Sequence, residues 1–464
     1  MPWPFARLYT QRVTSAKRFV IIGADAAGMS AAMEARRADP KLRITAFDRG
    51  VAASYSQCGL PYWLGGVIAS RERLVARTVE DFRARDVDVR LRHEVTAIDT
   101  ARGVVRVRDL GGGREFDEPY DRLLVATGAS PVEFPLPGRD LPGVFTLDVL
   151  EDADAIRAYL REHAPRRAVI VGGGYVGLEL AENFTRLGLS VSLVQRGDQV
   201  FHSVDAELAA PLHEELERHG VDLNLSDSLV KACSGSGGRV RQVTTTQGDL
   251  DADLVVLATG VKPNVDLAVN AGIPFGPTGA LAVDDRMRTG VQGVYAAGDC
   301  AEHFHRVLGK PVWIPLGTTA NKQGRVAGRN VTGGDARFAG IVATAVAKVF
   351  DLGVARTGLN EWEARAAGLD VRTVVLDSTD QAGYMPDAED LTVKLVVERA
   401  TGRLLGGQAV GRRGADKRVD VLATALYAGL TVSQLPELDL AYSPPFNSVW
   451  DPVQVAAVKL TRGS

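Results

Sequence analysis

Two apolar segments of the chain run directly into glycine-rich turns and then into helix-like stretches. Residues 19–22 lead into a turn at residues 23–28, and residues 168–171 lead into a turn at residues 172–177. A short apolar run, a tight turn and a helical pattern together indicate a buried strand joined to a helix. In such a unit the backbone N–H groups at the helix N-terminus can approach a pyrophosphate. The pattern therefore predicts two dinucleotide-binding units of α/β structure.

The first turn departs from the usual glycine fingerprint at one position. Gly23 and Gly28 match the first and third glycines of the fingerprint. Asp25 stands where the second glycine normally lets the backbone approach a phosphate. The next apolar strand ends at Asp48, 25 residues after Gly23. An acidic residue at that point can bind a ribose hydroxyl, so the turn and Asp48 are predicted to hold one nucleotide together.

The second turn carries the complete fingerprint, at Gly172, Gly174 and Gly177. Its next strand ends at Gln195 and Arg196 instead of an acidic residue. Without a carboxylate to repel a 2′-phosphate, and with an arginine able to pair with one, this unit is predicted to accept NADPH or both nicotinamide nucleotides. The alternative is that Arg196 is a solvated loop residue.

Three later apolar strands end in small polar motifs. Two of them end in Ala-Thr-Gly, first at Thr127 and Gly128 and later at Gly260, and a third ends in Gly298 and Asp299. In a doubly wound sheet, ligands lie in the crevice beyond the carboxyl ends of the strands. These motifs are therefore predicted to line the nucleotide sites.

The composition fits a globular protein with an ample core. The chain has 464 residues, enough for about three domains. It carries 54 Lys plus Arg against 57 Asp plus Glu and has no basic run, which excludes nucleic acid and membrane surfaces as expected partners. The longest apolar stretch, residues 421–432, has the length of a buried helix and falls short of the roughly 18 residues of a membrane span. Residues 1–17 lack the pattern of a signal peptide and are predicted to be an extension.

Three cysteines, Cys58, Cys233 and Cys300, form no CxxC pair and no metal-ligand spacing. This usage is typical of a reducing compartment, and we expect the chain to work in the cytoplasm. The positions five residues before and after Cys58 hold Ala53 and Trp63, so a two-thiol redox pair is excluded there. Cys233 and Cys300 are predicted to be buried and inert.

Cys58 is the candidate reactive thiol because it directly precedes a predicted helix. The residues Gly-Leu-Pro-Tyr after Cys58 are predicted to open that helix. The positive end of the helix dipole lowers the pKa of a nearby thiol, so we expect a lowered pKa at Cys58.

The order of glycine fingerprint, Ala-Thr-Gly, second fingerprint, Ala-Thr-Gly and Gly-Asp resembles the pyridine nucleotide-disulfide oxidoreductase family, from about Lys17 to the C-terminus. The resemblance implies a first fold that holds FAD, a second fold inserted into it that holds NADPH or NADH, and a C-terminal α+β domain that forms a homodimer. The implied domains are residues 1–17 (extension), 18–145 with 267–335 (FAD), 146–266 (NAD(P)H) and 336–464 (dimerisation). The implied cofactor-binding residues are Gly23, Ala27, Gly28, Asp48, Arg49, Thr127, Gly128, Gly172, Gly174, Tyr175, Gly177, Gln195, Arg196, Gly260, Gly298 and Asp299.

Three of these residues have specific implied roles. Asp48 matches the residue that binds the adenosine ribose, and Asp299 the one that hydrogen bonds to the ribityl chain of FAD. Tyr175 matches the residue that shields the flavin until nicotinamide displaces it. The alternative for Tyr175 is a packed aromatic residue at a helix start.

The pattern Ser54-x-x-x-Cys58-Gly-Leu-Pro-Tyr resembles the single-cysteine branch of the family. That branch contains coenzyme A-disulfide reductases, NAD(P)H persulfide or polysulfide reductases, and NADH oxidases and peroxidases. Gln57 replaces an asparagine common in the coenzyme A-disulfide reductases. Tyr384 and Tyr442 match tyrosines that reach the active-site sulfur from the partner subunit, where a phenol can act as a general acid. The alternative is a pair of ordinary interface tyrosines.

The resemblance also implies a substrate-binding region. Arg37, Lys322 and Arg325, with Gln57, are candidates for contacts with coenzyme A, although lysines and arginines on helices usually face solvent. Phe446 and Trp450 replace residues that are often polar in the family, so the pocket is expected to be more apolar.

The resulting prediction is an FAD-dependent NAD(P)H oxidoreductase that reduces a small disulfide or persulfide through Cys58, with derivatives of coenzyme A as the candidate substrates. Ser54, Cys58, Tyr384 and Tyr442 are its predicted catalytic residues. One alternative is an oxidase or peroxidase that uses a sulfenic acid at Cys58, and another is a redox-sensing flavoprotein. No metal site is expected, because His303 and His305 lack further convergent ligands.

Overall fold

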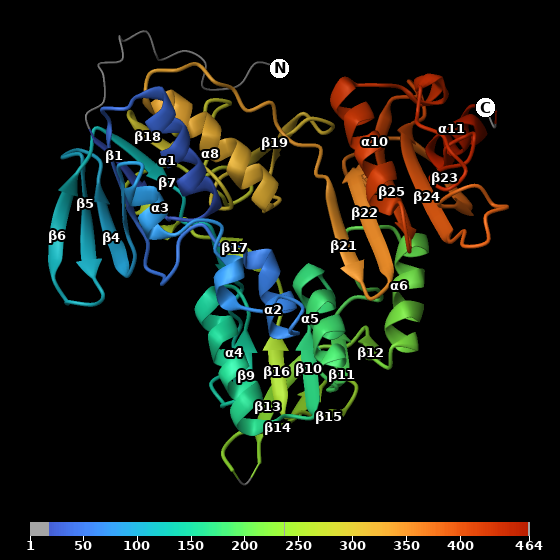
Figure 1. Ribbon diagram of the computed structural model, residues 1–464, viewed down its shortest axis with the longest axis horizontal. Coiled ribbons are helices and arrows are strands. Elements are labelled where there is room, and N and C mark those ends of the chain that lie inside the picture. Colours follow the sequence, from blue (N-terminus) through green and yellow to red (C-terminus); the bar gives the residue numbers. More distant parts are fainter. Residues whose placement is uncertain (1–17, 236, 463–464) are drawn as a thin grey trace.

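A computed structural model describes residues 18–235 and 237–462. The predicted N-terminal extension, residues 1–17, lies outside the described residues. Figure 1 shows three bodies, with the first nucleotide-binding fold at upper left, the second below it, and the C-terminal domain at right. This arrangement matches the predicted α/β class, whereas the residue boundaries given above for the domains stay predictions.

The first fold is built on a parallel sheet with the strand order β18-β7-β1-β2-β3. Its central strand is almost wholly buried, which explains the continuous apolar run that predicted it. The strands are β1 (Arg18–Ile22), β2 (Arg43–Phe47), β3 (Val87–Arg90), β7 (Arg122–Val125) and β18 (Val294–Ala296). The helices are α1 (Ala26–Ala38), α2 (Leu60–Leu64), α3 (Val79–Arg83), α7 (Asp266–Val269) and α8 (Gly317–Val331), with short helices η1 (Gln57–Gly59) and η2 (Arg71–Leu74).

Helices α1 and α8 lie against each other over this sheet (Figure 1). Two glycines of α8 allow the contact: a Cβ atom at Gly324 would lie 2.2 Å from the carbonyl oxygen of Ala27, and one at Gly328 would lie 2.3 Å from that of Ala31. A side chain at either position would separate the helices, so these two glycines determine how closely α8 approaches the first glycine turn.

An antiparallel sheet β4-β5-β6 flanks the first fold. Its strands are β4 (His93–Asp99), β5 (Val104–Asp109) and β6 (Glu115–Pro119). The three glycines at residues 111–113 lie in the hairpin between β5 and β6. Two small pairs, β8 (Ala129–Pro131) with β17 (Val261–Pro263) and β19 (His303–His305) with β20 (Lys310–Val312), complete this part.

The second fold contains a parallel sheet with the order β12-β11-β10-β16-β9. A small antiparallel sheet, β13-β14-β15, lies below it in Figure 1. The strands are β9 (Val144–Thr146), β10 (Arg167–Val171), β11 (Ser190–Gln195), β12 (Asp222–Leu225), β13 (Leu229–Ser234), β14 (Val240–Thr245), β15 (Asp249–Asp251) and β16 (Leu254–Leu257). The helices are α4 (Leu150–His163), α5 (Tyr175–Arg186) and α6 (Ala206–Arg218).

The C-terminal domain is an antiparallel sheet, β21-β22-β25-β24-β23, packed with helices. Its elements are β21 (Ala345–Val349), β22 (Leu352–Gly358), α9 (Glu361–Ala366), β23 (Val371–Thr379), β24 (Asp390–Glu398), β25 (Leu404–Gly411), α10 (Ala415–Ala428), η3 (Val432–Glu437) and α11 (Pro452–Arg462). The apolar stretch at residues 421–432 lies partly in α10, which ends at Gly429 because that residue takes a left-handed conformation, φ 73°.

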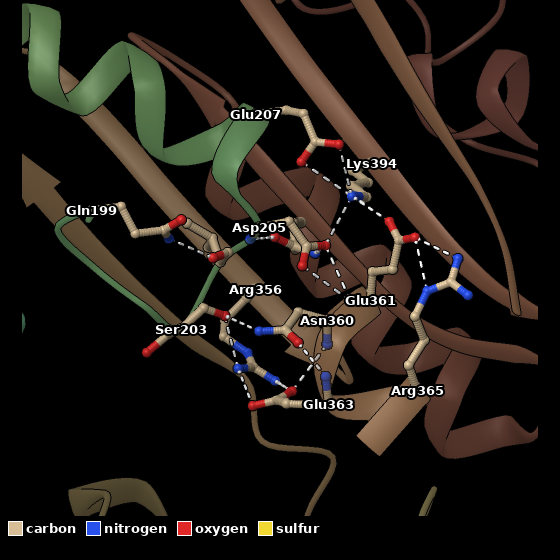
Figure 2. A network of polar contacts seen from close by, with 12 residues as sticks. Gln199, Ser203, Asp205, Glu207, Arg356, Asn360, Glu361, Glu363, Arg365 and Lys394 are labelled. Atoms are coloured by element: carbon tan, nitrogen blue, oxygen red, sulfur yellow. Dashed lines mark hydrogen bonds and ion pairs between the residues drawn. The ribbon is translucent and has the colours of Figure 1, made fainter. Parts of the chain in front are cut away.

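A buried polar cluster joins the second fold to the C-terminal domain (Figure 2). The ammonium group of Lys394 on β24 is only 1% exposed and lies 3.1 Å from Asp205, 3.1 Å from Glu207 and 2.9 Å from Glu361. Asp205 also accepts a hydrogen bond from the side-chain amide of Gln408. Because buried charges need partners on every side, the cluster holds α6, α9 and β24 in one arrangement.

Candidate functional site

The first glycine turn is a close-packed cradle at the carboxyl end of β1. A Cβ atom at Gly23 (φ +104°) would lie 2.1 Å from the Ala126 carbonyl oxygen, and one at Gly28 would lie 1.9 Å from that of Gly23. Asp48 holds the turn in place, because its Oδ2 accepts the N–H of Ala24 at 2.7 Å. Its Oδ1 accepts the N–H of Gly50 at 2.7 Å.

The Gly-Asp motif after β18 provides a buried acceptor beside this cradle. The N–H of Gly298 donates to Gln323 at 2.9 Å, and a Cβ at Gly298 would meet Ala27 at 2.9 Å. The Oδ1 atom of Asp299 is buried without a hydrogen-bond partner among the described residues. Burial raises the pKa of Asp299 to about 6. Such an oxygen requires a donor, which fits the hydroxyl-bearing chain of a bound nucleotide.

Three further residues predicted to bind this nucleotide follow strands β7 and β2, namely Thr127, Gly128 and Arg49. Thr127 donates its hydroxyl to the Asn264 carbonyl oxygen at 2.6 Å, and Gly128 has a φ of +68°. Arg49 is exposed, directly after Asp48.

The second glycine turn repeats the geometry of the first. A Cβ at Gly172 would lie 2.3 Å from the Ala258 carbonyl oxygen, and one at Gly177 would lie 1.8 Å from that of Gly172, whereas Gly174 faces open space. The side chain of Gln195 accepts the N–H of Gly173 at 2.9 Å. Gln195 thus supports this turn as Asp48 supports the first, but without a charge.

Three predicted residues surround this second turn. Arg196 is exposed next to Gln195, and Gly260 has a φ of +95° after β16. Tyr175 is the first residue of α5 and packs edge-on against Phe201, with ring centroids 4.6 Å apart. Tyr175 is half-buried and packed against its neighbours, in keeping with the packed-aromatic interpretation, and its role as a shield stays a prediction.

Cys58 lies in η1, directly before α2, and is exposed. Figure 1 shows α2 at the level where the two nucleotide-binding folds meet. The expected lowering of the thiol pKa is wrong for this chain: the pKa of Cys58 is raised, first because of desolvation and then because of the charge of Glu179. The helix after Cys58 has only five residues and offers a weak dipole.

The segment before Cys58 is fixed to the first glycine turn. Ser54 has a left-handed backbone, φ 49°, and donates its N–H to the Ala24 carbonyl oxygen at 2.9 Å. The N–H of Tyr55 donates to Oδ1 of Asp25 at 3.1 Å. Gln57 is exposed and its side chain hydrogen bonds to Tyr55.

Tyr62, the last residue of the cysteine motif, lies near Cys58 together with a glutamate that the sequence motifs did not reveal. The hydroxyl of Tyr62 on α2 donates to Glu179 on α5 at 3.2 Å. Burial raises the pKa of Glu179 to about 7. The available signal was spacing: Glu179 stands four residues after Tyr175, and residues four apart share a helix face.

Cys233 and Cys300 differ from Cys58 in their surroundings. Cys300 is fully buried, as predicted, and its thiol donates to the Val125 carbonyl oxygen at 3.4 Å. Cys233 is half-buried and not buried as expected, because β13 is an edge strand of its small sheet.

The two C-terminal tyrosines lie together on the C-terminal domain. Their hydroxyls share a hydrogen bond, which raises the pKa of Tyr384. Tyr384 is 73% exposed and Tyr442 48%. Tyr384 follows β23 in the domain at the right of Figure 1, whereas Cys58 precedes α2 at the centre, so one chain does not bring the tyrosines to the thiol.

The predicted substrate-binding cations lie on α1 and α8. Arg37 pairs with Glu34 at 2.6 Å, and Arg325 approaches the same carboxylate at 4.0 Å. Lys322 is exposed on α8, three residues before Arg325. The structure thus gathers two of the three cations around one glutamate.

The histidines considered for a metal site are buried. His303 and His305 each have a pKa lowered to about 4 by desolvation. The one group with metal-binding spacing among the described residues is Glu215, His219 and Asp351, and its carboxylates pair with Arg218. In the described part of the chain, none of the helices is long and apolar enough to cross a membrane.

Two family descriptions match the chain. "Pyridine nucleotide-disulphide oxidoreductase" matches residues 17–324, and the dimerisation domain of the same family matches residues 344–452. The chain belongs to the pyridine nucleotide-disulphide oxidoreductase family. Membership confirms the predicted fold class and makes the chain an FAD-dependent oxidoreductase that uses NAD(P)H.

Three curated relatives of this oxidoreductase cover nearly its whole length. A Pyrococcus horikoshii protein named NAD(P)H coenzyme A polysulfide/persulfide reductase is 41% identical, over 95% of this chain and 98% of its own. A Methanocaldococcus jannaschii NADH oxidase is 32% identical, over 95% of this chain and 98% of its own. A Staphylococcus aureus coenzyme A disulfide reductase is 30% identical, over 95% of this chain and 99% of its own.

Two solved structures of the family have nearly the same fold as this oxidoreductase. The NAD-dependent persulfide reductase from A. fulgidus has a TM-score of 0.93 at 40% identity, covering 96% of this chain and 83% of its own. The reduced CoADR-RHD from Bacillus anthracis has a TM-score of 0.93 at 36% identity, covering 97% of this chain and 81% of its own.

Proposed function

We propose that the protein reduces the sulfur–sulfur bond of a small persulfide or disulfide derived from coenzyme A, with Cys58 as the redox-active thiol. The observation that carries the proposal is Cys58 itself, a lone exposed cysteine at the junction of the two nucleotide-binding folds. The persulfide is the favoured acceptor, because the relative named for polysulfide and persulfide is 41% identical and the one named for disulfide is 30% identical. All three cysteines are free, in keeping with the reducing cytoplasm as the proposed location.

In this proposal the first cradle holds FAD and the second holds NAD(P)H. The unpartnered Oδ1 of Asp299 and the glycine cradle at Gly23 fit the ribityl and pyrophosphate groups. An uncharged Gln195 and an exposed Arg196 leave room for the 2′-phosphate of NADPH as well as for NADH. When bound, the two cofactors supply a pair of electrons near Cys58.

The thiol chemistry consists of two balanced steps. The Cys58 thiolate attacks the inner sulfur of the persulfide, so that a mixed disulfide with coenzyme A forms and hydrosulfide leaves. The two electrons then break the mixed disulfide, which restores the Cys58 thiolate and releases coenzyme A. In sum, NAD(P)H, one proton and the persulfide give NAD(P)⁺, coenzyme A and hydrogen sulfide.

The departing thiolate needs a proton donor, and we assign this role to Tyr384 and Tyr442 of a second subunit. Both hydroxyls are exposed and hydrogen-bonded to each other, so either can reach a group outside its own chain. Phe446 is 71% exposed and Trp450 54%, which suits an interface that excludes water from the sulfur. Arg37, Lys322 and Arg325 stay candidates for the phosphates of coenzyme A.

Turnover of the purified enzyme tests this proposal. NADPH or NADH consumption is followed with coenzyme A persulfide, coenzyme A disulfide and dioxygen, for the parent, Cys58→Ser and the control Cys233→Ser. We expect the parent and the control to reduce the persulfide fastest and Cys58→Ser to lose at least about 100-fold in turnover. Equal turnover by Cys58→Ser would refute the thiol mechanism.

The same measurement tests a second function. The relative named NADH oxidase, at 32% identity, favours dioxygen reduction through a sulfenic acid at Cys58 as the runner-up. Turnover with dioxygen alone that depends on Cys58 would select that function.

A further inference from the structure

Asp25 has a carboxyl group in an unusual place, between the two glycines of the first cradle. It is the N-cap residue of α1, and its side chain interacts with the N–H of Ala26 but makes no capping bond to the later amides of the first turn. Oδ1 instead accepts the N–H of Tyr55 at 3.1 Å, which turns the carboxyl toward the segment that carries Cys58. The first-turn amides after Ala26, which bind phosphate in such folds, therefore lack the capping bond that this carboxylate could have made.

The charges that act most strongly on Asp25 are all negative. The charges of Asp48, at the end of β2, and of Asp299, after β18, both act on it, and Tyr55 and Cys58 are the titratable groups of the neighbouring loop. The backbone N–H groups of Tyr55 and Ala26 favour the charged form of Asp25, but desolvation outweighs them. The pKa of Asp25 is consequently raised to about 7, before any phosphate is near.

A pyrophosphate bound in this cradle would add further negative charge beside the same carboxyl. Like charges disfavour ionisation, so the bound anion must raise the pKa of Asp25 again. At a pH above the pKa that Asp25 has in the protein without pyrophosphate, binding of the pyrophosphate requires the carboxyl to take up a proton from solvent. Below that pKa the carboxyl is already neutral.

We propose that Asp25 is a proton-linked affinity switch for FAD. Its carboxyl is neutral when the pyrophosphate lies in the first cradle, and it is charged when the cradle is empty in alkaline solution. The inference rests on the proposed FAD site and not on the identity of the sulfur acceptor.

Flavin retention by the holoenzyme tests the switch without any turnover. Holoenzyme is diluted serially at pH values from about 6 to 8.5, and the fluorescence of released FAD gives the apparent Kd. For the parent we expect a constant Kd up to about pH 7 and a rise of up to about tenfold per pH unit above it. Asp25→Asn keeps an acceptor for the Tyr55 N–H but cannot ionise, so its Kd should not change with pH.

Three further variants make the outcome unambiguous. Asp25→Gly restores the fingerprint glycine and should also show no pH dependence, even if Asp25→Asn fails to retain flavin. Asp140→Asn, an exposed position, should follow the parent. A parent Kd without pH dependence, or a parent-like slope in both Asp25 variants, overturns the proposal. Asp299→Ala should weaken FAD retention at every pH. Unchanged retention in Asp299→Ala would show that the FAD site itself was wrongly assigned, independently of the result for Asp25.

Discussion

At the scale of single residues, the reactivity of Cys58 depends on carboxyl groups that are remote in sequence. Glu179 comes from α5 of the second fold and raises the pKa of a thiol that belongs to the first. The pKa of Glu179 is itself about 7, so its charge varies within the physiological range. The thiol and helix α5 of the second fold are therefore electrostatically coupled.

Replacing Glu179 by glutamine should make Cys58 more reactive. Glu179 is charged above pH 7 and disfavours the thiolate there, so its removal lowers the pKa of Cys58. We expect Glu179→Gln to be alkylated by iodoacetamide several-fold faster than the parent at about pH 8, and little changed at about pH 6. The matched control Glu214→Gln, an exposed residue on α6, should behave as the parent. An unchanged rate in Glu179→Gln would contradict the coupling.

The sequence was informative about residues that act through local backbone geometry. Gly23, Gly172 and Gly177 could be assigned because a turn of that shape leaves no space for a Cβ atom. The shift in the pKa of Cys58 could not be predicted from the sequence. The desolvation of the thiol and the position of Glu179 are both set by packing between segments that are distant in sequence.

At the scale of elements, the buried cluster around Lys394 fixes α6 and α9 to β24 (Figure 2). Nothing in the local sequence of β24 predicts it, since a lysine in a strand usually faces solvent. The strands of the two parallel sheets were easier to predict, because strands covered on both faces are continuous apolar runs. The C-terminal sheet was implied only by resemblance.

Lys394→Met should destabilise the protein strongly. The change leaves the buried Asp205 and its neighbouring glutamates without their cation, which typically costs about 3–5 kcal/mol. The measurement is the midpoint of thermal unfolding by circular dichroism, with Lys417→Met on the exposed face of α10 as the control. The control should change the free energy of unfolding by no more than about 0.5 kcal/mol. Similar midpoints for the two variants would show that the cluster contributes little.

At the scale of the whole molecule, the proposed active site requires two copies of the chain. The tyrosine pair and Cys58 lie in different regions of one chain, and the chain contains the dimerisation domain of its family. In a symmetric dimer each site would combine the thiol of one subunit with the tyrosines of the other.

Mixed dimers should restore activity between two inactive variants. One subunit carries Cys58→Ser, and the other carries Tyr384→Phe with Tyr442→Phe. A mixed dimer then has one site with every catalytic group intact, and random mixing should recover about a quarter of the parent turnover. The control is each variant mixed with itself. No recovery on mixing would indicate that thiol and tyrosines do not meet across subunits.

The contacts between the second fold and the C-terminal domain also limit how this enzyme can admit its reductant. Lys394 and Gln408 hold Asp205, and Lys348 binds Glu182 on α5 at 2.7 Å. With α5 and Asp205 held from this side, a lid-like opening of the second fold would have to break these contacts. We propose that admission then depends on the rotation of a single ring, that of Tyr175, which matches the residue that shields the flavin in the family. Rotation of one ring would let the enzyme bind its reductant quickly and would expose the flavin to dioxygen only briefly.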